Sequence, residues 1–104
     1  MVDRSFGFVD LCGFTDHLDS RGPEAAADEV LLMRAAVRSA AQANGVRVDK
    51  WLGDGAMLVG VDPGPVVVAL AQISRDLMLG PMALEVRAGF AHGQVILIEG
   101  DDYV

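Results

Sequence analysis

Residues 46–61 read VRVDKWLGDGAMLVGV, and this stretch decides the expected fold. The side chains of its first half alternate between two faces of an expected strand, with Val46, Val48, Lys50 and Leu52 on one face and Arg47, Asp49 and Trp51 on the other. Gly53-Asp54-Gly55 is typical of a tight turn, and residues 56–61 form a second, apolar strand. The stretch therefore predicts a β-hairpin.

Helices are expected on both sides of this hairpin. The first covers residues 24–44, where apolar side chains recur at helical spacing and Gly45 supplies a left-handed cap. The second begins at Asp62-Pro63, ends at Gly80-Pro81, and carries the apolar stripe Val66, Leu70, Ile73 and Leu77. Further strands are expected at residues 5–11 and 84–91, and at 95–98 after a turn at Gly93. In the 84–91 strand the residues expected to face inward are Leu84, Val86, Ala88 and Phe90.

The element order β-α-β-β-α-β predicts an α+β fold of the ferredoxin-like type, with an antiparallel sheet and two main helices on one face. Right-handed crossovers place the first strand beside the third and antiparallel to it. The last residues of the first strand then lie next to the first residues of the third. Because Asp10 and Asp54 occupy these two places, we expect their carboxylates to converge at the sheet edge.

Composition limits the class of protein. The chain has 104 residues, 52% of them hydrophobic, which is enough for one small domain. The formal net charge of −7 and the lack of clustered cations argue against binding to nucleic acid or to an anionic membrane. A single cysteine, Cys12, excludes an internal disulfide, and no apolar run reaches the roughly 18 residues of a membrane span. Without a signal peptide at the N-terminus, a cytoplasmic domain is expected.

Paired carboxylates beside a glycine turn suit divalent cations and phosphate. Mg²⁺ commonly takes one or two carboxylates together with substrate phosphates. The turn at residues 12–15 presents backbone N–H groups at an expected helix start, with Thr15 as the expected cap, and such an end attracts anions. The simpler alternative makes Asp10 a turn cap and Asp54 an ordinary hairpin residue.

Several motifs together resemble the catalytic domain of the class III nucleotidyl cyclases, the adenylate and guanylate cyclases. Residues 8–15 (FVDLCGFT) resemble the first metal motif of that family, and residues 47–57 (RVDKWLGDGAM) resemble the second. Residues 87–95 and 100–103 resemble the strand, turn and loop that follow. The resemblance covers the whole chain in the same order, and it implies a bacterial adenylate cyclase that acts in intracellular signal transduction.

The resemblance also implies roles for individual residues. Two Mg²⁺ or Mn²⁺ ions would bind Asp10 and Asp54, the catalytic pair, with help from the backbone carbonyl of Leu11. The triphosphate of ATP would lie against Gly13, Phe14 and Thr15. Lys50 and Asp102 would contact the base, since Lys50 can donate to N1 of adenine and an acid can accept from its amino group. In this family each site forms between two protomers, so a homodimer with shared active sites is implied.

The chain also departs from the family pattern. Family members continue beyond the Asp-Asp-Tyr loop into a helix whose Asn orients the ribose and whose Arg stabilises charge on the phosphate. Residues 1–104 contain no such helix, so they are expected to form a partial catalytic domain, truncated before it and inactive alone. We expect no substitute for that arginine from Arg87, in the middle of its strand, or from Arg4, far from Asp10.

Other functions fit less well. The chain is either a fragment of a cyclase or a catalytically inactive module for dimerisation or nucleotide sensing. A diguanylate cyclase would need a different hairpin turn, and an RNA-binding sheet would need more positive charge and more aromatic side chains. His92 is expected to make a local hydrogen bond, and Trp51 is expected either in the core or at a subunit contact.

Overall fold

The computed structural model describes the backbone of residues 1–98 and 102–103 and the side chains of residues 1–96. In chain order the elements are β1 (Val2–Leu11), α1 (Phe14–Arg21), α2 (Pro23–Asn44), β2 (Arg47–Trp51), β3 (Gly55–Gly60), α3 (Pro63–Leu79), β4 (Val86–Val95), β5 (Leu97–Ile98) and β6 (Asp102–Tyr103).

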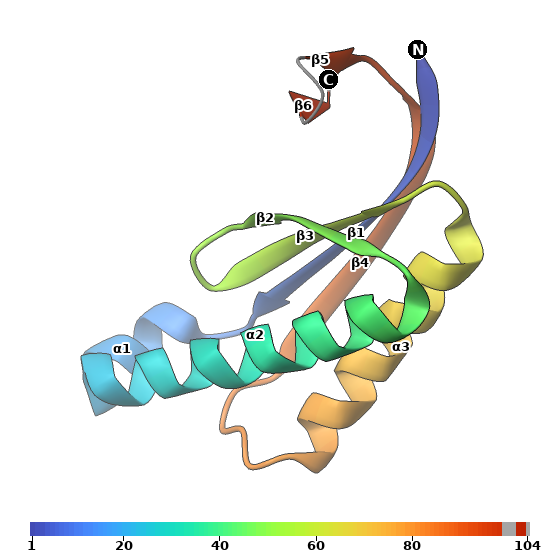
Figure 1. Ribbon diagram of the computed structural model, residues 1–104. Helices are drawn as coiled ribbons and strands as arrows, with labels where there is room; N and C mark the ends of the chain where they lie inside the picture. Colours follow the sequence, from blue (N-terminus) through green and yellow to red (C-terminus); the bar gives the residue numbers. More distant parts are fainter. Residues whose placement is uncertain (99–101, 104) are drawn as a thin grey trace.

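The main sheet has four strands in the order β2-β3-β1-β4, and every neighbouring pair is antiparallel. Helices α2 and α3 lie together on one face of this sheet, while the short strands β5 and β6 pair beside the N-terminus (Figure 1). No helix of the described residues covers the opposite face of the sheet, and we call it the open face. The expected ferredoxin-like α+β fold is therefore confirmed.

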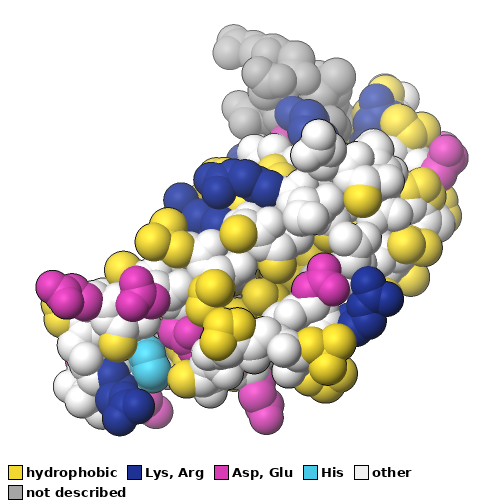
Figure 2. Space-filling model, turned by 60° about the horizontal axis from the view of Figure 1, so that its bottom comes forward, with side chains coloured by type: hydrophobic (Ala, Val, Ile, Leu, Met, Phe, Trp, Pro, Cys, Tyr) yellow, Lys and Arg dark blue, Asp and Glu magenta, His cyan; other side chains and the backbone are white. Residues whose placement is uncertain are grey.

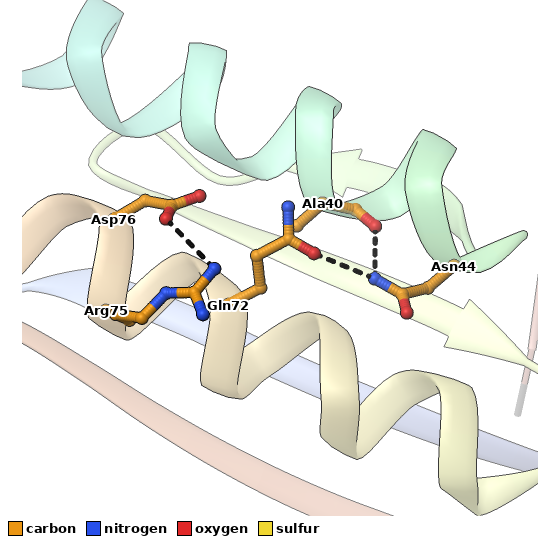
Figure 3. Close-up of polar contacts among 5 residues, drawn as sticks. All are labelled: Ala40, Asn44, Gln72, Arg75 and Asp76. Carbon is orange, nitrogen blue, oxygen red and sulfur yellow. Dashed lines mark hydrogen bonds and ion pairs between the residues drawn. The ribbon is translucent and has the colours of Figure 1, made fainter.

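The core fills the space between the sheet and the two long helices. Its fully buried side chains include Met33 and Val37 of α2, Val66 and Ile73 of α3, and Leu58 of β3. Next to this core the two helices share a polar contact, shown in Figure 3, in which the side-chain amide of Asn44 donates to the carbonyl of Ala40 and to Oε1 of Gln72. Each long helix buries one apolar stripe, and this explains why apolar residues at helical spacing in the sequence predicted both helices.

Helix ends follow the local chemistry that the sequence indicated. Gly45 adopts a left-handed conformation, with φ of 65°, and its N–H closes α2. The left-handed region costs glycine nothing because it has no Cβ. Helix α3 begins at Pro63 and buries Val66, Leu70, Ile73 and Leu77 as expected, together with Ala69.

The expected faces of the first hairpin strand are wrong beyond Val48. The pairing of β2 with β3 shifts between Val48 and Lys50, which inserts Asp49 as a bulge. Val48 and Trp51 consequently both pack toward the core, whereas Lys50 pairs with Met57 on the open face. The guanidinium groups of Arg34 and Arg38 lie 4.9 Å and 5.0 Å from the centre of the Trp51 ring, so Trp51 is a core and helix-packing residue.

Three expectations for the last long strand also need correction. β4 begins at Val86 rather than at residue 84, and it continues through Gly93 to Val95, so Gly93 is not a turn. The expected strand at residues 95–98 is reduced to β5. Ala88 and Phe90 lie on the helix side of the sheet as expected, opposite Val9 and Gly7, but they are exposed rather than buried, because β4 is an edge strand that α3 covers only in part.

The surface charge is unevenly distributed. Figure 2 shows acidic side chains gathered at the end of the molecule that holds α1 and the start of α2, and these helices carry Asp16, Asp19, Glu24 and Asp28. Basic and exposed hydrophobic side chains appear both at this end and elsewhere in the same view. Among the described residues, no helix combines the length and the apolar character needed to cross a membrane.

Candidate active site

The end of β1 and the turn of the β2–β3 hairpin meet as expected. Asp10 pairs directly with Gly55, and the N–H of Leu11 donates to the backbone carbonyl of Asp54 at 3.1 Å. The turn itself is tight, because Leu52 and Gly55 exchange backbone hydrogen bonds of 2.9 Å and 3.2 Å across Gly53 and Asp54. This geometry holds Asp10 and Asp54, which are distant in sequence, at one place.

An open cavity of about 430 Å³ lies at this meeting point. Direct partners on neighbouring strands share one face of the sheet. Asp10 pairs with Gly55 and with Arg87, and Phe8 pairs with Gly89, so Asp10 and Gly89 both face the cavity from the open face. The lining residues are Phe8, Val9, Asp10, Leu52, Asp54, Gly55, Ala56, Arg87, Ala88 and Gly89. The volume falls within the range of small-molecule sites.

Arg87 supplies the positive charge that lines this cavity, and the sequence did not predict it at this place. Its Nε donates to Oδ1 of Asp10 at 3.1 Å, and its Nη2 donates to Oδ2 at 2.9 Å. The expectation that Arg87 lies in the middle of its strand is wrong, because β4 starts at Val86 and Arg87 is its second residue. Antiparallel pairing of β1 with β4 was the signal that could have located it, since it brings the start of β4 to the end of β1.

The ion pair also affects the charge state of Arg87. The hydrogen bond to Asp10 raises the pKa of the Arg87 guanidinium above its ordinary value, and the negative charges of Asp10 and Asp54 act in the same direction. Arg87 therefore stays cationic at any pH at which the protein is folded.

The turn after β1 forms the start of α1. Gly13 has a left-handed φ of 74° and is the N-cap residue, so the helix begins at Phe14 and Thr15 lies inside it rather than capping it. The first helical hydrogen bond runs from His17 N–H to the Gly13 carbonyl, so the N–H groups of the first helical turn have no acceptor within the helix and can meet an anion. The N–H of Cys12, before the helix, donates to the carbonyl of Glu85 at 2.8 Å. The side chain of Phe14 packs against the core, so only its backbone could meet a phosphate.

Of the two expected base contacts, the structure describes the side chain of Lys50 alone, and Lys50 does not line the cavity of its own chain. Lys50 is exposed on β2 and shares the open face with Asp10, but strand β3 separates them. Asp102 belongs to β6, and its side chain lies outside the described residues, as do Gly100 and Asp101 entirely. His92 makes the expected local contact, a 2.6 Å hydrogen bond between its Nδ1 and the hydroxyl of Ser5.

The donor set fits a divalent cation that takes part of its coordination from a ligand. Asp10 and Asp54 supply carboxylate oxygens, which are the hard donors that Mg²⁺ and Mn²⁺ prefer. Within the described part of the chain, no cluster of three or more acidic, histidine or cysteine side chains surrounds a common point. Protein side chains alone therefore offer two carboxylates, the number that Mg²⁺ uses together with substrate phosphates and water.

Comparison with known proteins identifies sequence relatives of the chain. No model of a known protein family matches the sequence. The chain is 34% identical over 100 residues to the uncharacterized protein Rv2212 of Mycobacterium tuberculosis and equally to the uncharacterized protein Mb2235 of Mycobacterium bovis. These matches cover 96% of the chain but only 26% of each relative, so the chain spans about a quarter of their length.

Several solved structures share the architecture. A bacterial light-regulated adenylyl cyclase superposes with a TM-score of 0.80 at 20% identity, covering 91% of this chain and 55% of that one. The adenylyl cyclase CyaB from P. aeruginosa gives 0.76 at 22% identity over 98% and 64% of the two chains. The guanylate cyclase domain of RhGC from Catenaria anguillulae, solved with GTP, gives 0.81 at 16% identity over 91% and 58%.

Proposed function

Because the chain has the fold of nucleotidyl cyclase catalytic domains, we propose that residues 1–104 are part of an adenylate cyclase domain that converts ATP to 3′,5′-cyclic AMP and pyrophosphate. The observation that carries the proposal is the convergence of Asp10 and Asp54 on one open cavity. The reaction would take place in the cytoplasm as a step of signal transduction.

The residues at the cavity have separate tasks in this proposal. Asp10, Asp54 and the backbone carbonyl of Leu11 would hold two Mg²⁺ or Mn²⁺ ions. Such ions make the ribose 3′-hydroxyl more acidic and neutralise charge on the phosphates. The N–H groups of Gly13, Phe14 and Thr15 would orient the triphosphate, and the planar fork of Arg87 can donate two hydrogen bonds to phosphate oxygens.

The choice of adenine depends on Lys50, because the shared fold includes both adenylyl and guanylyl cyclases. Adenine presents an acceptor at N1, which suits the ammonium group of Lys50, whereas guanine presents a donor there. Asp102 is the proposed acceptor for the adenine amino group.

A two-fold homodimer with shared active sites completes the proposal. Lys50 is separated from Asp10 by strand β3 of the same chain, so one chain does not hold the phosphates and the base at a single cavity. If Lys50 of a second copy faces the cavity, both ends of the nucleotide are bound, and the symmetry creates two equal sites. The exposed Phe8 on the open face supplies apolar contact area for this pairing.

Calorimetry with a non-hydrolysable ATP analogue tests the proposal. We expect binding in the presence of Mn²⁺, no binding in chelator, and loss of the Mn²⁺-dependent binding in Asp10→Asn. Asp28→Asn is the control, because it removes an exposed carboxylate of α2 away from the cavity. Equal affinity with Mn²⁺ and with chelator would overturn the proposed metal site.

A further inference from the structure

Both carboxylate oxygens of Asp10 are already engaged. The distances of 3.1 Å from Arg87 Nε to Oδ1 and 2.9 Å from Nη2 to Oδ2 describe a fork-on-carboxylate pair, which is the strongest arrangement that an arginine makes with an acid. The backbone register sets this contact, since Asp10 and Arg87 are direct partners across β1 and β4. Any cation that binds Asp10 must therefore compete with Arg87.

The same pair is open to solvent. The Arg87 side chain is 72% exposed and the Asp10 side chain 44%, and ion pairs in such positions are weak because water screens them. A competing ligand can consequently open the pair at small cost. Base does not open it under ordinary conditions, because the guanidinium remains charged.

We infer that Arg87 is a counter-ion latch on Asp10, which holds the metal ligand closed until a divalent cation arrives together with a nucleotide. The inference rests on the proposed function, since it assigns Asp10 to the metal. Without nucleotide, the bound guanidinium opposes a cation at Asp10 both by occupying the oxygens and by its positive charge. When phosphate oxygens are present, the displaced guanidinium can bind them instead, because they are negatively charged like the carboxylate that it leaves.

The latch makes metal and nucleotide binding interdependent. A coupling free energy between two ligands acts equally on both. With the latch, Arg87 weakens the binding of metal alone and strengthens the binding of metal together with nucleotide. Loss of an exposed ion pair and of one positive charge near Asp10 should change the affinity for metal alone by about three- to tenfold.

Titration with Mn²⁺ alone, followed by calorimetry or by the electron paramagnetic resonance signal of the free ion, tests this latch. Arg87→Met keeps an unbranched side-chain stem and removes the guanidinium with its charge, and we expect it to bind Mn²⁺ alone about three- to tenfold more tightly than the wild type. With Mn²⁺ present, the same variant should bind a non-hydrolysable ATP analogue more weakly. Arg87→Lys keeps the charge without the fork, should lie between the two, and carries the same test if Arg87→Met folds poorly.

The control is Arg75→Met, which removes an arginine of equal type that pairs with Asp76 on α3, outside the cavity. It should leave both affinities unchanged. Unchanged Mn²⁺ affinity in both Arg87 variants, while the wild type binds Mn²⁺, would overturn the latch and leave the proposed function standing. Failure of the wild type and of all variants to bind Mn²⁺ or the analogue would overturn the proposed function and the latch with it.

Discussion

Gly55 shows how closely the site is packed at the level of one residue. A Cβ built at this position would lie 2.7 Å from the carbonyl oxygen of Val9 and 3.3 Å from Cβ of Asp10. The first contact is with backbone, so β1 or β3 must shift. Because Asp10 is on the shifted segment, the position of its carboxylate depends on the absence of a side chain at Gly55.

We predict that Gly55→Ala lowers the free energy of unfolding by about 1–3 kcal/mol, as overpacking in a tight site does. It should also weaken Mn²⁺-dependent nucleotide binding. Gly64→Ala is the matched control, because no described atom lies within 4 Å of its Cβ and Gly64 is in the first turn of α3. Urea unfolding measures the difference, and equal stability of the two variants would show that β1 and β3 separate without cost.

Lys50 offers a test of base selection. In a protein that includes the complete catalytic domain, Lys50→Glu should reduce ATP turnover sharply, because a carboxylate would face an acceptor at adenine N1. Loss of hydrogen-bond complementarity at such a site can reach a factor of about 10⁴ in discrimination. Turnover of ATP and of GTP is compared with Arg75→Glu, which makes the same charge change on α3. An unchanged ratio of the two activities would place Lys50 outside the base pocket.

At the level of elements, a buried acid of α2 holds the segment that leads into β4. Glu29 is 5% exposed, and its Oε1 accepts hydrogen bonds of 2.7 Å from the N–H groups of Ala83 and Leu84. These N–H groups are held by the helix, and β4 starts two residues later at Val86. Glu29 thereby contributes to the placement of Arg87 opposite Asp10, although it takes no part in the ion pair between them.

We predict that Glu29→Ala lowers the free energy of unfolding by about 2–3 kcal/mol, since it leaves two part-buried donors without their charged acceptor. Glu29→Gln keeps a carbonyl acceptor of the same shape and should lose about half as much. Urea unfolding gives the free energies, and amide hydrogen exchange at Ala83 and Leu84 locates the change. Equal loss in both variants would mean that the negative charge, rather than hydrogen bonding, provides the stabilisation.

At the level of the whole molecule, we predict that the 104-residue chain makes no appreciable cyclic AMP, even with Mn²⁺. Attack on the α-phosphate spreads negative charge over its oxygens, and loss of an arginine at such a centre costs about 10³–10⁵ in rate. Among the residues that line the cavity, Arg87 is the one cation. The latch assigns it to phosphate oxygens of the bound nucleotide, so no second cation of the cavity is left for the charge that develops during the attack. In the family that the chain resembles, a helix that follows the region matched here supplies the arginine and asparagine for this step.

The assay compares cyclic AMP formation by the purified chain with that of Asp54→Asn, which serves as the blank. Turnover well above the blank, at rates ordinary for enzymes, would show that a residue within the chain stabilises the reacting phosphate. Arg87 would then be the first candidate, and Arg87→Met would identify it.

Local sequence was sufficient for the two long helices, α2 and α3, and for the pairing of β1 with β3, whereas it predicted only a short helical turn where α1 (Phe14–Arg21) forms. Helical spacing and the glycine and proline ends are short-range properties, so α2 and α3 were predicted to within a residue or two. Right-handed crossovers then determined the strand order, and with it the convergence of Asp10 and Asp54. The sequence by itself therefore determined the architecture and the two carboxylates of the candidate site, but not the position of Arg87.

Tertiary structure alone decided the bulge at Asp49, the exposure of Phe90, and the Arg87–Asp10 pair. A bulge depends on how two strands fit against the same core, and the exposure of an edge strand depends on how far α3 extends over it. The partner of Arg87 depends on where β4 starts, which Glu29 influences from another helix. None of these follows from neighbouring residues in the sequence, because each arises from contacts between segments that only packing brings together.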